Sequence, residues 1–381
     1  MGYKSLDMRP KEWKTRVGII LILALVPLLF LIGCKPQKPT SKVEKGKPKV
    51  VVRPEPLKRV TGKVKVAFVS LRDGNEEIYV MDANGKRQAR LTSNADADID
   101  PQVSPDGEVV VWRARDARGF WQLYSMAIET EKPSLLATKT GGDVLSFSWS
   151  SHSTWIAFVK VFESREDRHV WLMDREGRIQ TSVLSEAADS SEDDLAWFSD
   201  NERLAFVQQT SGDVPKIFWR FVPHSRESLF LSSGTKPSVS PDKKWVAFVN
   251  LQGEVAVVAT QGGAARVLAQ TRLPSDAVSR PQWSPDSKLV IFGALFEARQ
   301  KGNGVFVVNV DGTGFKKLTS GFNPRWAPDG KRVFFEDLES NTMGVETRQV
   351  FSVKPGGKAR VQLTQTDLGE NHSPYPFVAS E

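Results

Sequence analysis

The chain has 381 residues, with 52 Lys and Arg against 45 Asp and Glu, 40% hydrophobic residues and a single cysteine. This composition excludes wholesale disorder and a collagen-like fibre, and one cysteine excludes an internal disulfide or a multi-cysteine zinc cluster. The positive charge belongs to the N-terminus, because residues 64–381 carry 37 basic and 41 acidic side chains. Such a body lacks the concentrated cationic surface that nucleic acids need, so no nucleic acid partner is expected.

Residues 1–33 are predicted to be an export signal. Five basic side chains precede an apolar run from Val17 to Ile32, which is the pattern of a secretory signal peptide. The run is shorter than a spanning helix and contains Pro27. An uncleaved anchor helix is the alternative.

The end of this run resembles the bacterial lipobox, with the sequence Leu31-Ile32-Gly33-Cys34. In that motif the thiol takes a diacylglycerol, and the cysteine becomes the first residue of the mature chain. We therefore predict lipidation at Cys34, followed by a tether over residues 34–63 that is rich in Lys and Pro. In lipoproteins of this kind, Lys35 after the cysteine favours the outer membrane. We expect a protein of the bacterial cell envelope, lipid-anchored in the outer membrane and facing the periplasm.

Residues 64–381 are built from one repeated unit. A turn signature recurs at steps of about 45 residues. The better copies are Ser104-Pro105-Asp106-Gly107, Ser240-Pro241-Asp242-Lys243, Ser284-Pro285-Asp286-Ser287 and Ala327-Pro328-Asp329-Gly330. Degenerate copies begin at Ser150 and Phe198, and Ser373-Pro374-Tyr375 is taken as a last, partial copy. Pro presets the first central residue of a type I turn and Gly accepts the positive φ that follows, so a strand is expected on each side.

The strand after each turn carries two columns of apolar residues. An aromatic residue stands eight residues after each of the first six anchors, and Phe68 opens the series in an extra copy. A branched aliphatic residue stands two residues before each aromatic. The aromatic column is Phe68, Trp112, Phe158, Phe206, Phe248, Phe292 and Phe335. Because strand side chains alternate with period two, both columns lie on the same face. The tryptophans just before the anchors, Trp149, Trp197, Trp283 and Trp326, are expected in the core as well.

Four strands per unit of about 45 residues predict an all-β, seven-bladed β-propeller with four-stranded antiparallel blades. Six blades are the alternative. Residues 66–92 supply three strands of the first blade. The segment around Tyr375 is expected to supply the fourth, so that a C-terminal strand pairs with the N-terminal blade and closes the ring.

The order Leu91-Thr92, Asp98, Pro101 and Ser104-Pro105-Asp106-Gly107 resembles the TolB-like propeller repeat. The resemblance implies a mostly non-enzymatic propeller that binds partner proteins in the cell envelope. The chain departs from TolB itself in lacking the N-terminal α/β domain, in its lipobox and in its count of seven blades.

Catalytic signatures were sought and not found. The four histidines form no metal-binding pair, and no nucleophile elbow occurs. Ser240 and Lys243 match a β-lactamase-type spacing but belong to the turn signature. The segment Asp96–Asp100 resembles half of a calcium loop, yet it lacks the glycine and the final glutamate. We expect a solvated loop there, no metal site and no cofactor.

The best candidate site is the column four residues before each anchor, where the chain enters the innermost strand. These residues should ring the mouth of the central channel. The candidates are Asp100, Ser146, Asp194, Lys236, Arg280 and Asn323, with Gly369 in the seventh place.

These observations predict a monomeric, non-enzymatic docking scaffold whose partner is another envelope protein, such as a peptidoglycan-associated one. The alternative is a propeller that binds a ligand at the channel mouth, or that acts there as a hydrolase or lyase on a peptide or glycan. Convergent carboxylates or histidines around the channel would favour the enzyme.

Overall fold

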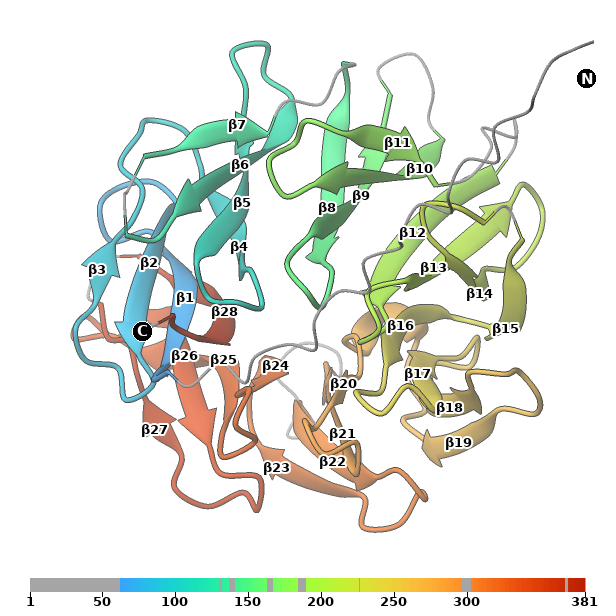
Figure 1. Ribbon diagram of the computed structural model, residues 1–381. Coiled ribbons are helices and arrows are strands. Elements are labelled where there is room, and N and C mark those ends of the chain that lie inside the picture. The colour runs from blue at the N-terminus through green and yellow to red at the C-terminus, as the bar shows by residue number, and fades with distance from the viewer. Residues whose placement is uncertain are drawn as a thin grey trace, which may run out of the picture. The chain divides into compact units, whose positions relative to one another are not determined.

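The computed structural model describes residues 62–380, apart from 130–131, 137–140, 163–166, 184–189, 226, 296–302 and 367–368. Seven four-stranded antiparallel sheets form blades around a central axis (Figure 1). The seven-bladed prediction is confirmed, and the six-bladed alternative is wrong. Lipidation at Cys34 and nearly all of the tether fall outside the described residues and remain predictions.

The strands are grouped by their position in the blades. The innermost strands are β28 (Asn371–Val378), β4 (Ile99–Val103), β8 (Asp143–Trp149), β12 (Ser190–Trp197), β16 (Thr235–Val239), β20 (Gln282–Trp283) and β24 (Phe322–Trp326). The second strands are β1 (Val64–Ser70), β5 (Val109–Arg115), β9 (Trp155–Val161), β13 (Arg203–Thr210), β17 (Trp245–Val249), β21 (Leu289–Ala294) and β25 (Val333–Ser340). The third strands are β2 (Glu77–Asp82), β6 (Trp121–Ala127), β10 (Arg168–Asp174), β14 (Lys216–Phe221), β18 (Val255–Ala259), β22 (Gly304–Asn309) and β26 (Glu346–Val353). The outer strands are β3 (Ala89–Arg90), β7 (Ser134–Leu136), β11 (Gln180–Ser182), β15 (Leu229–Ser233), β19 (Arg266–Ala269), β23 (Lys316–Thr319) and β27 (Val361–Gln362).

Blades 1 to 7 are numbered by their second strands, from β1 to β25. In the described part of the chain, the single helical element is the short 3-10 turn η1 (Ser275–Ala277). No described helix is long and apolar enough to span a bilayer.

The core lies between neighbouring blades, where the two predicted columns face the same way. All seven aromatic residues of the column are at most 1% exposed. Val110 and Trp112 share one cluster, and Val66 and Phe68 share another. The prediction of a common buried face is therefore confirmed, and blade-on-blade burial is the main stabilising contact.

The repeated turns adopt the predicted geometry and also link neighbouring blades. Gly107 has φ 80°, and in the degenerate copies Ser153 and Asn201 take the same left-handed conformation at 60° and 63°. Their side chains explain why glycine is dispensable there. Ser153 Oγ accepts the Asp106 N–H of the preceding blade at 3.1 Å, and Asn201 Oδ1 accepts the His152 N–H at 3.1 Å.

The ring closes as predicted, because β28 pairs antiparallel with β1 in blade 1. The register of the last repeat, however, was predicted wrongly. Val66 pairs with Pro376 in blade 1, as Val110 pairs with Val103 in blade 2. Ser373 therefore corresponds to Asp100 rather than to Ser104. The two positions were confused because a Pro follows both of them in the repeat.

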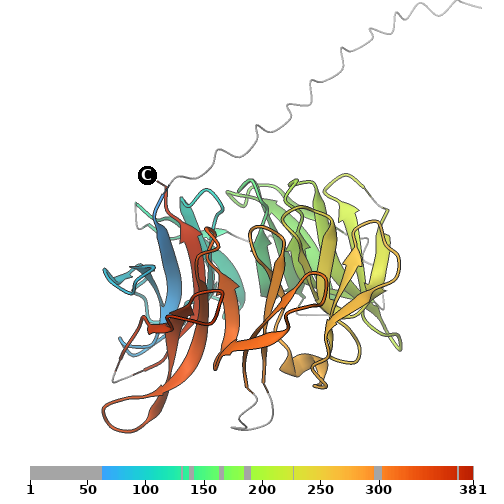
Figure 2. The same ribbon diagram turned by 90° about the horizontal axis from the view of Figure 1, so that it is seen from below.

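The disc has two distinct faces. The repeated turns lie on one side, together with both described ends of the chain, since Gly107 packs closely against Val378 and Ala379. We call this side the turn face; it is uppermost in Figure 2 and faces the viewer in Figure 1. The innermost strands begin at the opposite side, which we call the entry face.

Candidate functional site

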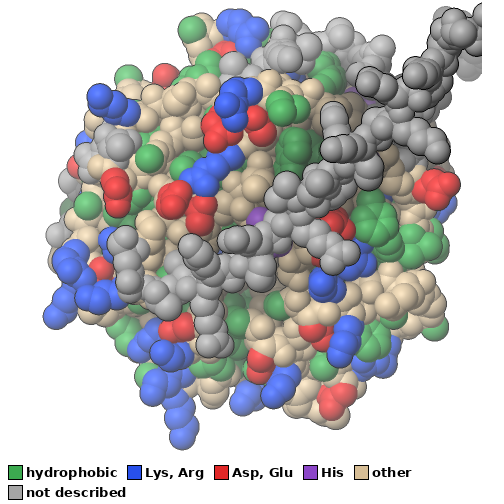
Figure 3. Space-filling view, viewed as in Figure 1, with side chains coloured by type: hydrophobic (Ala, Val, Ile, Leu, Met, Phe, Trp, Pro, Cys, Tyr) green, Lys and Arg blue, Asp and Glu red, His purple; other side chains and the backbone are tan. Residues whose placement is uncertain are grey.

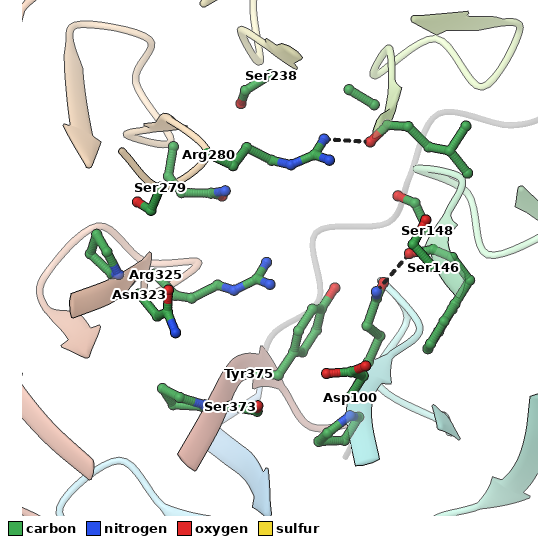
Figure 4. Close-up of a pocket in the computed structure, with 18 of the residues that line it drawn as sticks. Asp100, Ser146, Ser148, Ser238, Ser279, Arg280, Asn323, Arg325, Ser373 and Tyr375 are labelled. Carbon is green, nitrogen blue, oxygen red and sulfur yellow. Dashed lines mark hydrogen bonds between the residues drawn. The ribbon is translucent and has the colours of Figure 1, made fainter. Parts of the chain in front are cut away.

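The central channel holds a cavity of about 530 Å³, which lies within the size range of ligand pockets. All seven innermost strands contribute to its lining, together with Arg113 of β5 and Glu336 of β25. Figure 4 shows the longest of the labelled side chains, Arg280, Arg325 and Tyr375, extending toward the centre. The site is thus made by the strand entries of every blade.

A bulge at the strand entry aims these side chains. Asp100, Asp194, Lys236, Asn323 and Ser373 are left-handed, with φ between 48° and 57°. At each of these five entries the strand pairing shifts register. A bulge re-aims a side chain at the cost of an unfavourable φ. The five residues are therefore held in position before any ligand arrives.

Four of the six predicted site residues line the cavity, namely Asp100, Ser146, Arg280 and Asn323. Asp194 and Lys236 are outside this lining and are engaged in hydrogen bonds of the channel wall, and a binding role for the six residues stays a prediction. Gly369 was assigned to the column wrongly, because the corrected register places Ser373 there. The dipeptide X-Pro was the missed signal, since it marks five of the seven entries, at Pro101, Pro237, Pro281, Pro324 and Pro374.

Arg280 ties three blades together across the channel. Its guanidinium donates to Asp194 Oδ1 at 2.7 Å, to the Leu195 carbonyl at 2.7 Å and to the Pro237 carbonyl at 2.9 Å. Lys236 completes the tie. Its N–H donates to Asp194 Oδ2 at 2.9 Å, and its ammonium donates to the carbonyls of Ser275 and Val278. These charges hold the channel wall and have little capacity left for a ligand.

Arg113 is engaged in a similar way. It donates to Asp100 Oδ2 and, at 3.1 Å, to the Val144 carbonyl of the next blade. Asp100 therefore enters the channel as half of an ion pair. Sequence reasoning missed Arg113, because it lies on the second strand rather than in the entry column.

Arg325 differs from the other two arginines. It has no hydrogen bond or ion pair with any described residue, and its guanidinium carbon lies 5.5 Å from the centroid of the Tyr375 ring. The side chain is exposed to channel water. Protein nevertheless surrounds it, and this desolvation lowers the pKa of Arg325. Sequence reasoning missed Arg325 because it stands two residues after Asn323, the entry residue of its strand.

Glu336 lies behind the channel wall and is 1% exposed. Its Oε1 accepts the Ser373 N–H at 3.0 Å and the Asn323 side-chain amide at 3.2 Å. Burial raises the pKa of this carboxyl, opposed by the Ser373 hydrogen bond and by Arg348 at 3.6 Å. Two entry residues are thereby fixed to one buried acid.

Comparison with known proteins places the fold. The PD40 family, described as the TolB beta propeller domain, matches residues 61–219. A TolB homolog of Chlorobaculum tepidum is 27% identical over 123 residues, which are 32% of this chain and 27% of that protein. The propeller is thus TolB-like over residues 61–219. It spans a third or less of the length of the curated relatives it matches.

Solved structures agree with this fold. TolB from Acinetobacter baumannii has a TM-score of 0.50 at 15% identity, over 83% of this chain and 67% of that one. An oligogalacturonate lyase in complex with manganese has a TM-score of 0.60 at 13% identity, over 80% and 86%. At such identities the likeness concerns the fold alone.

In this TolB-like propeller the segment that resembles a calcium loop has a structural use. Asp98 is fully buried, which corrects the expectation of a solvated loop at that residue. Its Oδ1 accepts the Trp112 indole N–H at 2.9 Å, and its Oδ2 accepts the Asn94 amide at 2.7 Å. Among the described residues, no group of three or more His, Cys, Asp or Glu is arranged to hold a metal.

The tryptophans that precede the turns join neighbouring blades of the TolB-like ring. Trp149, Trp197 and Trp283 each donate the indole N–H to a carbonyl on the innermost strand of the preceding blade, at 3.4, 3.1 and 2.8 Å. Trp149, Trp283 and Trp326 are buried as predicted. Trp197 is only half-buried and also lines the channel.

Proposed function

We propose that this protein is a non-enzymatic docking scaffold of the bacterial cell envelope, lipid-anchored at Cys34, whose channel receives an acidic segment of a partner protein. Relatives named "Tol-Pal system protein TolB" support an envelope role with a protein partner. The lipobox and its position after the apolar run support the anchor. Lys35 supports the outer membrane, with the propeller in the periplasm.

The observation that carries the proposal is the charge left over in the channel. Arg113 is paired with Asp100, and Arg280 is paired with Asp194. Arg325 is the remaining cation of the described lining, and it extends into the cavity without an anionic partner (Figure 4). A guanidinium that faces the cavity without a counter-ion gains from pairing with an anion through charge-assisted hydrogen bonds.

A carboxylate fits this position best. The planar guanidinium binds carboxylates through two parallel hydrogen bonds. Ser146, another residue of the lining, has a hydroxyl without a hydrogen-bond partner among the described residues. The Tyr375 ring supplies an apolar wall next to Arg325. The cavity of about 530 Å³ has room for a few residues of a peptide.

The test is site-directed cross-linking in intact envelopes with the lipidated chain. Ser238 lines the cavity and has a small side chain, so Ser238→Cys introduces one thiol for a photoactivatable reagent. Cys34, the natural cysteine, is predicted to be acylated and unreactive. Ser211→Cys, on the exposed loop between β13 and β14, is the matched control.

We expect adducts from Ser238→Cys that contain an Asp, a Glu or a C-terminal carboxylate of one partner. Arg325→Met should weaken capture about 10- to 100-fold, the value of a charge-assisted hydrogen bond, and Arg325→Lys should weaken it less. Arg178→Met, at an exposed arginine on the turn face, should change nothing. Equal capture from Ser211→Cys, or capture that ignores Arg325→Met, would contradict the proposal. Turnover of a small peptide or glycan by the purified protein would replace it with the enzymatic alternative.

A further inference from the structure

A basic patch covers the turn face over blades 7 and 1. Six exposed cations form it, and they come from the start of β1, the loop between β2 and β3, the turn before β25 and the loop between β26 and β27. They are Lys63, Lys86, Arg87, Lys331, Lys354 and Lys358. Figure 3 shows Lys and Arg side chains gathered along this rim, at the lower left.

Most of this charge is not neutralised. Arg87 pairs with Asp82 at 2.5 Å, and Lys331 lies 3.5 Å from Asp329. The other four lysines form no ion pair with a described residue. The patch therefore carries a net charge of about +4, although residues 64–381 as a whole are mildly acidic.

The same face is balanced elsewhere. Over blades 2 and 3, Arg175 bridges Asp106 at 2.5 Å and Glu108 at 2.9 Å, and Arg178 bridges Asp174 and Glu176. The loops have the same position in the repeat, so the fold does not require a basic rim. Blades 2 and 3 therefore lack the excess of basic charge that blades 7 and 1 carry on this face.

The patch also surrounds the point where the described chain begins. The Lys63 carbonyl accepts the Ala379 N–H at 3.2 Å, so the strand that follows the tether starts within the patch. Residues 34–62 add nine basic and two acidic side chains along the chain just before it. If Cys34 is acylated, at most 28 residues separate the lipid from this face, a reach of roughly 100 Å.

We propose that the basic patch rests on anionic phospholipid headgroups at the membrane that holds the lipid anchor. This rests on the proposed lipidation and deepens it. A Lys or Arg is attracted to an anionic membrane surface, and the anchor makes the contact intramolecular, so a weak attraction suffices. The turn face would then face the bilayer. The entry face, with the channel mouth, would be presented to partners in the aqueous space.

The experiment uses the full lipidated chain in vesicles with one added cysteine that carries an environment-sensitive fluorophore. Gly356→Cys places the probe between Lys354 and Lys358, where an added side chain meets no atom within 4 Å. Met343→Cys, at a 62% exposed site between β25 and β26, places it on the entry face. The vesicles contain phosphatidylethanolamine with phosphatidylglycerol, or phosphatidylcholine alone, and each carries a lipid-borne quencher.

We expect at least threefold more quenching of the Gly356→Cys probe in anionic vesicles than in zwitterionic ones, and the loss of this difference in about 0.5 M salt. The Met343→Cys probe should stay unquenched in both. Lys354→Glu with Lys358→Glu should abolish the difference. The matched pair Lys243→Glu with Lys244→Glu, on the turn face of blade 5, should preserve it.

Several results would overturn the inference. They are equal quenching in both vesicles, quenching of the entry-face probe, or an equal effect of the blade 5 variant. Flotation with the vesicles but without quenching would contradict the membrane contact of the basic patch, and would leave the proposed anchor and docking function standing. Failure to float with either vesicle would contradict both the lipid anchor and the membrane contact of the patch.

Discussion

Two junctions of the ring occupy the same place in the repeat and differ in charge. At the junction of blades 1 and 2, the fully buried Glu77 accepts hydrogen bonds from Arg90 at 2.7 Å and from Thr92 at 2.6 Å. Thr92 Oγ1 accepts the N–H of the residue after Glu77 at 2.9 Å. The adjoining Asp98 holds the Trp112 indole. This junction contains two buried carboxylates and one arginine.

At the junction of blades 7 and 1, amides stand in these positions. Gln349 replaces Glu77, and its Oε1 accepts Thr364 at 2.9 Å. Gln362 replaces Arg90 and donates to the Thr364 carbonyl at 3.0 Å, as Arg90 does to Thr92. Asn371 replaces Asp98 and donates to Gln349 at 2.9 Å. Amides thus take the places of two carboxylates and one arginine, and the bonds to the threonine are retained.

The side chain that donates a hydrogen bond to Asp98 at one junction, and to Asn371 at the other, also differs. Phe68 occupies the place of Trp112 and has no N–H, and Arg72 instead donates to Asn371 Oδ1 at 3.0 Å. The side chains have therefore changed as a set. The comparison teaches that the repeat requires a satisfied hydrogen-bond network at each junction, whereas its charge is free to vary as long as every buried group keeps a partner.

The largest difference between the junctions is their connection, because only the junction of blades 7 and 1 depends on a strand from the far end of the chain. Ending the chain after Glu370 removes β28 and exposes Ala67 and Val69, which are fully buried. We expect the loss of at least about 5 kcal/mol, which is enough to abolish cooperative thermal unfolding. Circular dichroism during heating measures this.

A chain that ends after Ala379 keeps β28 and should unfold as the full chain does. A synthetic peptide of residues 371–381 should restore a transition to the shortened protein. An unchanged unfolding temperature in the chain that ends at Glu370 would show that the ring does not need its closing strand.

The second prediction makes the amide junction acidic. Gln349→Glu places a carboxylate at a site that is 1% exposed, where Gln362 stands in the position that Arg90 has beside Glu77. We expect a loss of about 3 to 5 kcal/mol at pH 8, the cost of an unpaired buried charge. Adding Gln362→Arg recreates the pair of Glu77 and Arg90 and should recover at least half of the loss. Urea denaturation of the four proteins of this cycle gives the coupling energy, and strict additivity would contradict the equivalence of the two networks.

The sequence was sufficient for the seven blades, the closing strand and the buried aromatic column, because these depend on local periodicity that recurs in each copy. The register at Ser373 was mistaken because Ser-Pro fits both the turn and the strand entry. Four of the six candidate channel residues followed from position in the repeat. The roles of Asp194 and Lys236 did not, because Arg280 reaches Asp194 across 86 residues of sequence. The sequence could not predict that Arg325 has no ion-pair partner either, because its surroundings are formed only when the ring closes.

The third prediction concerns pH and the acidic junction. Burial raises the pKa of Asp98 to about 6, from an ordinary value of 3.8, against the hydrogen bonds that favour its ionised form. A raised carboxyl pKa means that the folded protein binds the proton more tightly than the unfolded chain. The contribution of Asp98 to stability is therefore fully present below about pH 4 and declines until about pH 6, by at most about 3 kcal/mol.

Asp98→Asn should remove this decline while keeping an acceptor for Trp112. The free energy of unfolding relative to the unmodified chain, measured by denaturation at pH 4 to 7.5, should rise with pH through this window. Asn371→Asp should introduce a decline of the same sign at the other junction, made smaller by Arg72. A flat difference curve for Asp98→Asn would show that the buried carboxyl titrates normally.

The smallest expected effect concerns the donor that was exchanged. Arg72→Met removes the donor to Asn371 and the donor to Ser70 Oγ. It also removes the stacking of the guanidinium on the Tyr79 ring, whose centroid lies 4.5 Å from the guanidinium carbon. Asn371 is fully buried, so its Oδ1 would be left without this partner. We expect a loss of about 1 kcal/mol with an unchanged dependence on denaturant concentration. In the double variant Arg72→Met with Phe68→Trp, an indole N–H stands where Trp112 provides one, and recovery of stability would show that the two donors are interchangeable. A further loss would mean that the position of the donor, and not only its presence, distinguishes the two junctions.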